Sequence, residues 1–569
     1  MVFRFASSKL TRQRMAGLFA HLSLARVGRI ANRLKARLLE LMPGARCRRT
    51  EEMRRRKHGV ELLDAFSCAH KLGPCRYSKV LVDGMWDNPN FWTRFAFMRA
   101  ALALADSEMH GVLGPWNRER VSETMVALGV TPRHSLATNA ADIRRHRDAA
   151  HQMAQTVTCA DDAMKLQWPE GFPADVAYDG LLRRQRRGDV DPHDPRLAGH
   201  IAEALACLEQ AASILDACTY DLVLLSHALN FDFAALAWCA HVRGIEVLVL
   251  YGDYGANRFL RIDAPDAIYD MANVPSREVF DRLDVDAQAR MRHCGKEALA
   301  ERLGGMALDI GAVRAFGQGR GAVDRERVVR ELKLDPDKPI VCVYASNWFD
   351  FPHGAPMSHF RDFRDWIDAT IVAAAANRDV NWLFRAHPCD EWYGGVKGPT
   401  LADLLAKCPA DHITLVPPGW NGMDLMQAID AGVTYFGTVA IELASIGKPA
   451  LLADRGWYGQ LSFACMATSR EDYLSRLASL WWRGMDLEDA QDRAEQFAGW
   501  WFACPETDKL TMLRDDSQQE DIWRTLPDWL ELAGDAPAQE IELMDRWVKS
   551  GHRHFHVFRW LAAQDVFKS

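Results

Sequence analysis

Residues 221–251 read DLVLLSHALNFDFAALAWCAHVRGIEVLVLY, and this stretch decides the fold class. Its two ends, 221–226 and 246–251, are short runs rich in Leu and Val, which predict buried β-strands. Between them, 231–242 is apolar over the length of a helix, and a glycine follows soon after it. This order predicts a β-α-β unit in a parallel sheet that helices cover on both faces.

The same alternation precedes this unit. A strand is predicted over 79–83, a helix over 91–105 and a second strand over 109–113. The segment from there to about residue 218 is rich in Arg and Ala and predicts mainly helices. Together with 221–251, these elements predict a first Rossmann-like lobe.

A second alternation follows a charged, helical stretch that ends near residue 338 in a turn-like Asp-Pro-Asp-Lys-Pro run. Strands are predicted over 340–345, 381–385, 412–416, 433–436 and 450–453, and helices over 360–377, 401–407, 423–431 and 439–446. The fold class is therefore α/β, with two Rossmann-like lobes, a helical N-terminal arm and a tryptophan-rich helical C-terminal region packing over both lobes. The predicted boundaries are 1–75, 76–337, 338–470 and 471–569.

Composition agrees with a globular protein of more than one domain. The chain has 569 residues, 49% hydrophobic and 25% charged, which is ordinary for globular domains and too long for one core. The 13 cysteines include no Cys-x-x-Cys pair and predict reduced thiols in the cytoplasm, without a structural metal. The apolar region 222–250 is interrupted by charged residues, and the N-terminus is interrupted by arginines, so neither a membrane span nor a secretory signal is expected.

Charge is concentrated at the N-terminus. Residues 1–57 hold 16 Lys or Arg and 3 Glu, so the rest of the chain is acidic, which argues against nucleic acid as a partner. Residues 9–42 show helical spacing and end at Pro43-Gly44, which predicts a basic amphipathic helix. Two interpretations stay open: peripheral binding to the anionic inner face of the cell membrane, or packing on the rest of the protein.

Two strands of the second lobe end in residues suited to binding an anion. Ligands of open α/β sheets bind beyond the carboxyl ends of the strands. Arg385-Ala386-His387-Pro388 follows one strand and supplies a guanidinium and an imidazole, which would stabilise a leaving phosphate. A buried histidine that caps a turn is the structural alternative.

The other strand is followed by Gly437-Thr438 and then by a helix that carries Glu442. Here glycine permits a tight turn, threonine is a candidate helix cap, and a helix N-terminus offers backbone N–H groups to an anion. Glu442 is a candidate acceptor of hydrogen bonds from a ribose or sugar hydroxyl. Many α/β loops look like this without binding a ligand, but both motifs point to one crevice.

These two motifs, with the run from Gly437 to Pro449 and Tyr458, resemble the bacterial capsule polysaccharide biosynthesis family, which includes Kdo transferases and other HP-motif glycosyltransferases of the GT-B layout. The resemblance covers about residues 338–460. It implies a glycosyltransferase with a nucleotide-sugar donor as substrate, CMP-Kdo or another CMP-sugar being favoured, and a surface polysaccharide or glycolipid as acceptor. His387 and Gly437-Thr438 would hold the donor phosphate, and Glu442 would contact the nucleotide.

The resemblance also implies that no metal or cofactor is needed, because Arg385 and His387 would neutralise the leaving phosphate. Val439 stands where many family members have a second hydroxyl. This departure keeps a catalytically inactive glycan- or nucleotide-binding relative open as an alternative. A nucleotide-sugar 2-epimerase of the same layout is another.

A transferase also needs a base for the acceptor hydroxyl, and the candidates are residues that follow strands of the first lobe. The main candidates are Asp83 and Asp253, and Asp87 and His227 are further ones. A turn-capping role is the structural alternative for an aspartate before glycine. In the second lobe, Asn347 and Asp350 follow the strand 340–345 and are predicted to line the donor site.

Overall fold

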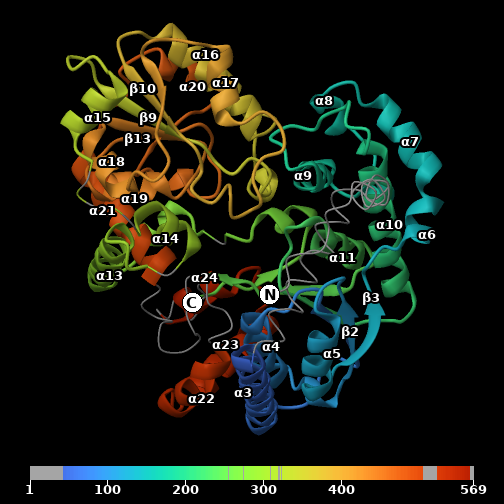
Figure 1. Ribbon diagram of the computed structural model, residues 1–569. Coiled ribbons are helices and arrows are strands. Elements are labelled where there is room, and N and C mark those ends of the chain that lie inside the picture. The colour runs from blue at the N-terminus through green and yellow to red at the C-terminus, as the bar shows by residue number, and fades with distance from the viewer. Residues whose placement is uncertain are drawn as a thin grey trace, which may run out of the picture. The chain divides into compact units, whose positions relative to one another are not determined.

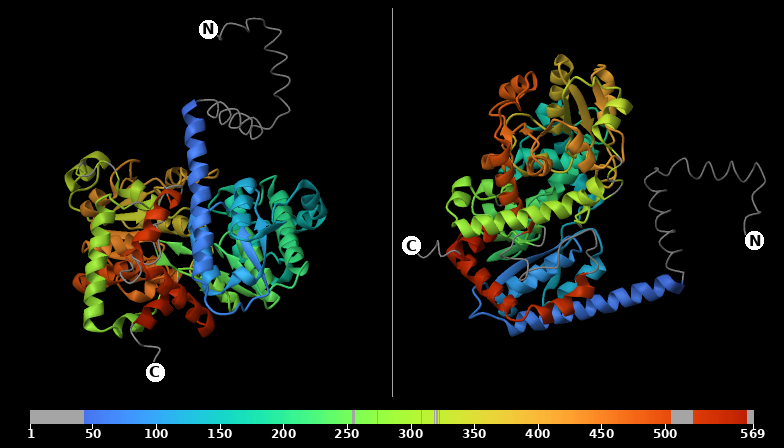
Figure 2. Two further views of the ribbon diagram at one scale, coloured as in Figure 1. Left: turned by 90° about the horizontal axis from the view of Figure 1, so that it is seen from below. Right: turned by 90° about the vertical axis from the view of Figure 1, so that its left-hand side faces the viewer.

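The computed structural model describes residues 43–563, apart from 254–255, 273, 308, 318, 320, 322 and 504–521. The predicted basic helix over 9–42 lies outside the described residues. The chain forms two units, 1–61 and 62–569, and the helix α3 (Pro43–Ala69) runs from one into the other. Figure 2 shows α3 as one long helix. The predicted helix end at Pro43-Gly44 is not confirmed, because both residues lie within α3.

The first sheet has the strand order β3-β2-β1-β4-β5-β8, and every neighbouring pair is parallel except β5 with β8. Its strands are β1 (Lys79–Gly84), β2 (Glu108–Leu113), β3 (Thr131–Ser135), β4 (Leu222–Leu225), β5 (Glu246–Val249) and β8 (Leu260–Arg261). The four strands predicted for this lobe are confirmed. The strand β3 is not predicted, because its sequence TPRHS is polar and lies at the sheet edge, where burial does not demand apolar residues.

The helices of this lobe are α4 (Pro89–Ala101), α5 (Arg118–Ala127), α6 (Ala140–Arg145), α7 (Arg147–Thr156), α8 (Ala160–Ala163), α9 (Ala174–Gln185), α10 (Leu197–Asp216) and α11 (Phe231–Val242). The predicted helix over 91–105 ends earlier because Ala103 has a left-handed backbone (φ 56°). Beyond β5 lies a two-stranded sheet of β6 (Gly252–Asp253) and β7 (Ala256–Asn257).

The second sheet has the order β11-β10-β9-β12-β13-β14, and all of its strands are parallel. They are β9 (Ile340–Tyr344), β10 (Asn381–Arg385), β11 (Ile413–Leu415), β12 (Ala431–Thr434), β13 (Ala450–Leu452) and β14 (Cys465–Met466). Its helices are α16 (Phe363–Ala376), α17 (Leu401–Lys407), α18 (Gly422–Ala428), α19 (Val439–Ser445) and α20 (Arg470–Leu477). Two Rossmann-like sheets are thus present, as predicted (Figure 1).

Four helices precede the second sheet, and they pack in its core. They are α12 (Arg277–Asp281), α13 (Val285–Leu303), α14 (Ile310–Phe316) and α15 (Arg325–Leu332). Phe280, Leu299 and Val328 share one buried cluster with Ile340 and Leu383 of the second sheet. The sequence boundary at 337 therefore divides one core, because it rests on a local turn signal, whereas the helices bury their apolar faces against residues that follow it.

The C-terminal helices pack on both lobes, as predicted. They are α21 (Leu487–Ala498), α22 (Ile522–Leu532), α23 (Ala536–Ser550) and α24 (Phe555–Ala563). The helix α21 lies against α13 and α19, while α22 and α23 lie against α4 of the first lobe. The aromatic side chains of this region are core rather than surface, since Trp500, Trp523 and Trp547 are almost fully buried.

Both sheets have a topological switch point at the middle of the strand order. In the second sheet the chain leaves β9 toward β10 and β11, and later returns to β12 on the other side of β9. In the first sheet the switch lies between β1 and β4. Open α/β sheets bind ligands in the crevice that forms at such a point, beyond the carboxyl ends of the strands.

Candidate functional site

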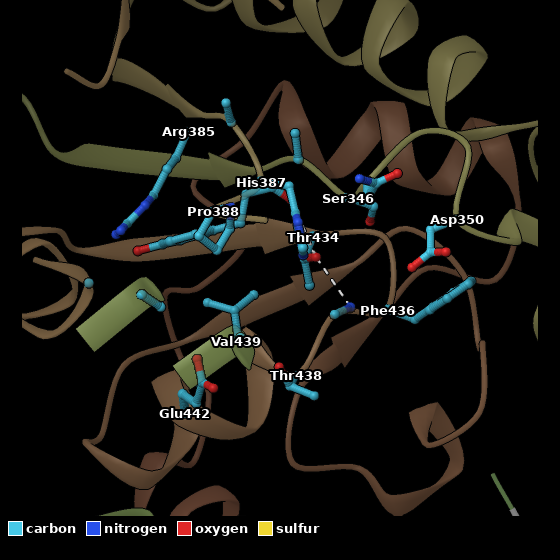
Figure 3. A pocket seen from close by; sticks show the side chains of 18 of the residues that line it. Ser346, Asp350, Arg385, His387, Pro388, Thr434, Phe436, Thr438, Val439 and Glu442 are labelled. Atoms are coloured by element: carbon cyan, nitrogen blue, oxygen red, sulfur yellow. Dashed lines mark hydrogen bonds between the residues drawn. The ribbon is translucent and has the colours of Figure 1, made fainter. Parts of the chain in front are cut away.

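A cavity of about 360 Å³ opens at the carboxyl ends of β9, β10 and β12. This is the switch point of the second sheet. The seven residues that we predict for the donor site all line this cavity: Asn347, Asp350, Arg385, His387, Gly437, Thr438 and Glu442. Figure 3 shows Arg385, His387 and Pro388 near the ends of the strands, with Thr438, Val439 and Glu442 lying across from them. The structure thus brings together residues from three strand ends that are far apart in the sequence.

Arg385 is the last residue of β10, and four buried residues before it anchor that strand in the core. Its Nη2 donates to the carbonyl oxygen of Trp420 at 3.0 Å. Among the described residues Arg385 has no acidic ion-pair partner, whereas Arg302 is paired with Glu442 and Arg183 with Asp350. The positive charge of Arg385 is therefore available to an anion in the cavity.

His387 lies two residues beyond β10, and its ring is neutral at neutral pH. Burial, with a smaller contribution from Arg385, lowers the pKa of His387 to about 4. Its Nδ1 accepts a hydrogen bond from the backbone N–H of Cys389 at 3.2 Å, so the ring proton lies on Nε2. His387 therefore has an Nε2–H donor to offer a phosphate oxygen.

The loop of Gly437 is held at both of its backbone polar groups. Its N–H donates to Oγ1 of Thr434 at 3.3 Å, and its carbonyl accepts from the hydroxyl of Tyr458 at 2.6 Å. Thr438 has helical backbone angles (φ −54°, ψ −20°), and among the described residues its side chain caps no N–H of α19. The predicted cap is thus wrong, since a capping side chain needs an extended backbone at that position.

Glu442 lies on the cavity wall but is held by a buried ion pair that we do not predict from the sequence. Its Oε1 accepts from Nε of Arg302 at 2.6 Å, and Nη1 of Arg302 donates to Oδ2 of Asp309 at 2.5 Å. The Arg302 guanidinium also lies over the ring of Phe502. Arg302 is one of several arginines in the charged helix α13, and no local signal marks it as the buried one.

Asp350 on the opposite wall is held from the first lobe. Arg183 of α9 forms an ion pair with Asp350 and lies over the rings of Phe351 and Tyr393. Tyr178 of the same helix donates a hydrogen bond from its hydroxyl to Oδ2 of Asp362 at 2.6 Å. Because α9 also packs in the core of the first lobe, it joins that core to the cavity wall.

Asn347 connects the cavity to Asp390, a titratable residue that we do not predict as part of the site. Its Nδ2 donates to Oδ1 of Asp390 at 3.2 Å. Burial, with help from the nearby Glu391, raises the pKa of Asp390 to about 7. The proximity of Asp390 to the Arg-Ala-His-Pro motif was a usable signal in the sequence.

The predicted base Asp83 lies at the switch point of the first sheet and is buried. Its Oδ1 accepts from the N–H of Met85 at 2.7 Å, and its Oδ2 accepts from the N–H and the hydroxyl of Ser226 at 3.0 and 2.6 Å. The carboxylate thereby connects the ends of β1 and β4. This arrangement favours a structural role, and its catalytic role stays a prediction.

The other first-lobe candidates also lie outside the donor cavity, and Nδ1 of His227 is 2.9 Å from the Ser226 hydroxyl that Asp83 binds. Asp253 lies in β6, and its side chain is outside what the structure describes. Asp87 is paired with Arg120 at 3.6 Å. His227 packs against Trp86, and burial lowers its pKa to about 4. The cavity of the second lobe includes none of these described side chains.

Burial raises the pKa of Asp83 from 3.8 to about 6, against the effect of its hydrogen bonds. A raised pKa means that the carboxyl group favours folding at low pH, and that this contribution disappears as the pH rises through about 6. The rise in the pKa from 3.8 to about 6 corresponds to at most about 3 kcal/mol of folding free energy. We expect the free energy of unfolding of Asp83→Asn, measured with urea at pH 4 to 7, to lose this part of its pH dependence. An unchanged pH profile would contradict the burial of a titrating Asp83.

Two further features of the described residues bear on the class of site. They contain no group of three or more His, Cys, Asp or Glu side chains placed to hold a metal ion. Of the helices described, none is long and apolar enough to cross a membrane.

No protein-family model matches the chain, and no curated protein matches it. Solved structures to which the chain is similar include UDP-N-acetylglucosamine 2-epimerases and glycosyltransferases. With the KpsC β-Kdo 2,4-transferase of Thermosulfurimonas dismutans, the identity is 15% and the TM-score 0.31, over 48% of this chain and 79% of that one.

With MnaA of S. aureus in complex with UDP, the identity is 11% and the TM-score 0.27, over 80% of this chain and 97% of that one. With the spinosyn rhamnosyltransferase SpnG, the identity is 12% and the TM-score 0.26, over 79% of this chain and 99% of that one. At these identities and scores the strand order and the site residues, rather than the likeness, are the basis for inferring function.

Proposed function

We propose that this chain is a glycosyltransferase that binds a nucleotide-activated sugar in the cavity of the second lobe. The observation that carries the proposal is the charge of Arg385, which has no acidic partner among the described residues, beside the Nε2–H of His387. It lies at a switch point where the two carboxylates of the cavity wall already have arginine partners. A site with one surplus cation and a neutral donor suits a phosphate group.

The chemistry follows from this arrangement. The bond between the anomeric carbon and the phosphate oxygen breaks, and its electron pair stays on the phosphate. The acceptor hydroxyl oxygen bonds to the anomeric carbon, and its proton passes to a base. Arg385 and His387 stabilise the charge that grows on the leaving phosphate, which lowers the barrier more than it tightens substrate binding.

The donor class rests on the resemblance of the Arg-Ala-His-Pro and Gly-Thr motifs to the capsule polysaccharide biosynthesis family. A CMP-sugar such as CMP-Kdo is the proposed donor, and a surface polysaccharide or glycolipid in the cytoplasm or at the inner membrane face is the proposed acceptor. Glu442, held by Arg302, has its second carboxylate oxygen for a hydroxyl of the nucleotide or the sugar. No metal is proposed to take part.

Nucleotide binding tests the donor site directly. We expect one of CMP, CDP, UDP and GDP to raise the melting temperature of the full chain, because a ligand that binds only the folded state stabilises it. His387→Ala should lose this shift, since the variant lacks the Nε2–H donor. Glu331→Ala, in an exposed ion pair on α15, is the matched control and should keep it.

Incubation with the matching nucleotide sugar then separates the functions. Release of the free nucleotide supports transfer or donor hydrolysis, and an unchanged rate with EDTA supports a metal-independent reaction. Conversion to an epimeric sugar nucleotide would instead identify a 2-epimerase. Stabilisation without turnover, with or without bacterial glycans, would identify a binding protein that lacks catalysis. Absence of any nucleotide shift would remove the proposed donor site.

A further inference from the structure

Two of the loops that line the donor cavity are held by α9, a helix of the first lobe. The loop 345–362 follows β9 and carries Asn347 and Asp350, and the loop 386–400 follows β10 and carries His387. Both loops contact α9 or the residue that ends it, and the buried side chains of α9 belong to the core of the first lobe. Part of the donor cavity is therefore attached to a core outside the lobe that forms it.

The segment Asn347-Trp348-Phe349-Asp350 shows how close this attachment is. Asn347 and Asp350 line the cavity, and Figure 3 shows Asp350 at its wall. Between them, Trp348 is buried in a core cluster of the second lobe and Phe349 in the core of the first lobe. Adjacent residues that are buried in different cores cannot move independently, because protein cores are closely packed. The two cavity residues thus depend on the packing of both lobes.

A buried pair of charges fixes the same loop further along the chain. The carboxylate of Asp179 in α9 accepts from the backbone N–H of His353 at 2.9 Å and from its Nδ1 at 2.7 Å. Burial lowers the pKa of His353, but the Asp179 carboxylate outweighs burial and raises the pKa to about 9, so the ring is charged. Separating two buried charges is costly, so α9 and the loop after β9 stay together.

Arg183 of α9 contacts both loops at once. It is paired with Asp350, and its guanidinium lies over the rings of Phe351 and Tyr393, 5.3 and 5.4 Å from their centroids. Tyr393 lines the cavity from the loop after β10. The pair also neutralises Asp350, whose carboxylate would otherwise repel a phosphate in the cavity.

Arg186 ends α9 at a position where glycine is the usual residue. Its backbone is left-handed (φ 54°), which is unfavourable for a residue with a side chain. Its Nη1 donates to the carbonyl oxygen of Gly394 at 2.6 Å, and its own carbonyl accepts from the N–H of Lys397 at 2.8 Å. A methyl group at Gly394 would lie 2.6 Å from this Nη1. Arginine at this position therefore holds the loop after β10.

We propose that Arg183 and Arg186 are positioning residues of the donor site, which hold the loops after β9 and β10 at the spacing that a nucleotide sugar requires. The inference rests on the proposed transferase function and adds a helix of the first lobe to its donor side. Neither arginine is among the described residues that line the cavity, so each acts through a loop rather than by touching the nucleotide.

The double variant Arg183→Ala/Arg186→Gly of the full chain tests this role. Glycine suits the left-handed backbone at 186, so this substitution removes the side chain without weakening the end of α9. We expect the nucleotide that stabilises wild type to bind about tenfold more weakly, measured by titration calorimetry. The KM for the donor should rise by about the same factor with kcat nearly unchanged, because the loops contact the donor before and during the reaction. Arg183→Lys should retain most of the affinity.

Arg184→Ala is the matched control. Arg184 lies in the same helix, but its partners Glu203 and Phe231 belong to the first lobe, so nucleotide affinity should be unchanged. In an Asp350→Asn background, Arg183→Ala should lower the affinity far less than in wild type, because the carboxylate that it positions is gone. An equal loss in both backgrounds, or the same loss in Arg184→Ala, would overturn the inference.

Amide hydrogen exchange without ligand separates this inference from the proposed function. Exchange in 345–362 and 386–400 should be faster in the double variant than in wild type and in Arg184→Ala. Faster exchange in a protein whose wild type binds no nucleotide would defeat the proposed function and leave the role of α9 in holding the loops. Unchanged exchange in both loops would overturn that role, as would a double variant that binds the nucleotide like wild type.

Discussion

Arg385→Ala is expected to lower turnover of the nucleotide sugar by about 10²- to 10³-fold, the usual effect of removing one donor that stabilises charge in a transition state. The charge of Arg385 is the one in the cavity lining without an acidic partner among the described residues, and Arg302, the other arginine of the lining, is held by Glu442. The measurement is the initial rate of nucleotide release at saturating donor. The melting temperature without ligand is measured as well, to show that the fold is unchanged.

Arg385→Lys is the informative companion variant. Lysine keeps the charge but lacks the planar fork that donates both to the Trp420 carbonyl and into the cavity. An intermediate rate is therefore expected. If Arg385→Ala were as active as wild type while its fold was unchanged, the leaving phosphate would have to bind elsewhere, and the proposed donor site would be wrong.

Glu442→Ala is expected to lower the free energy of unfolding by about 3–5 kcal/mol, because it leaves the buried guanidinium of Arg302 without its main partner. Asp309 remains in contact with Arg302 but is partly exposed, so it compensates only in part. Urea unfolding followed by tryptophan fluorescence measures the change.

Two variants give this expectation its controls. Arg302→Met/Glu442→Leu removes both charges and should recover most of the stability, since apolar pairs of similar size replace buried ion pairs at little cost. Glu331→Ala breaks an ion pair of almost the same length, 2.7 Å from Arg327, at the surface, and should cost less than about 1 kcal/mol. An equally small effect of Glu442→Ala would mean that Arg302 does not depend on this carboxylate.

Most strands and several helices of both sheets could be predicted from the sequence. The strands β5, β9 and β10 are continuous apolar runs bounded by turn residues, and their burial on both faces makes that pattern obligatory. The positions of Arg385, His387 and Gly437 could also be predicted, because residues after parallel strands gather at one sheet edge. Strand β3 could not, because an edge strand with a partly exposed surface needs no apolar pattern.

The partners of the site residues could not be predicted. Arg302 is 140 residues from Glu442, and Arg183 is 167 residues from Asp350. Each arginine lies in a helix with other arginines, and nothing local distinguishes the one that pairs with a carboxylate of the cavity wall. Asp83 is a candidate base because it lies at the end of a strand of the first lobe, but its hydrogen bonds depend on Ser226, which the parallel pairing of β1 with β4 brings beside it.

The sequence by itself determined the fold class and the places where chemistry gathers, since hydrophobic periodicity and strand ends are local properties of the chain. Tertiary structure alone decided which of those groups remain available. Ion pairs with arginines of distant helices neutralise Glu442 and Asp350, hydrogen bonds engage Asp83, and Arg385 keeps its charge for a ligand. The physical reason is that the availability of a charged group depends on which partners share its buried environment, and that is fixed only when segments far apart in the chain are packed together.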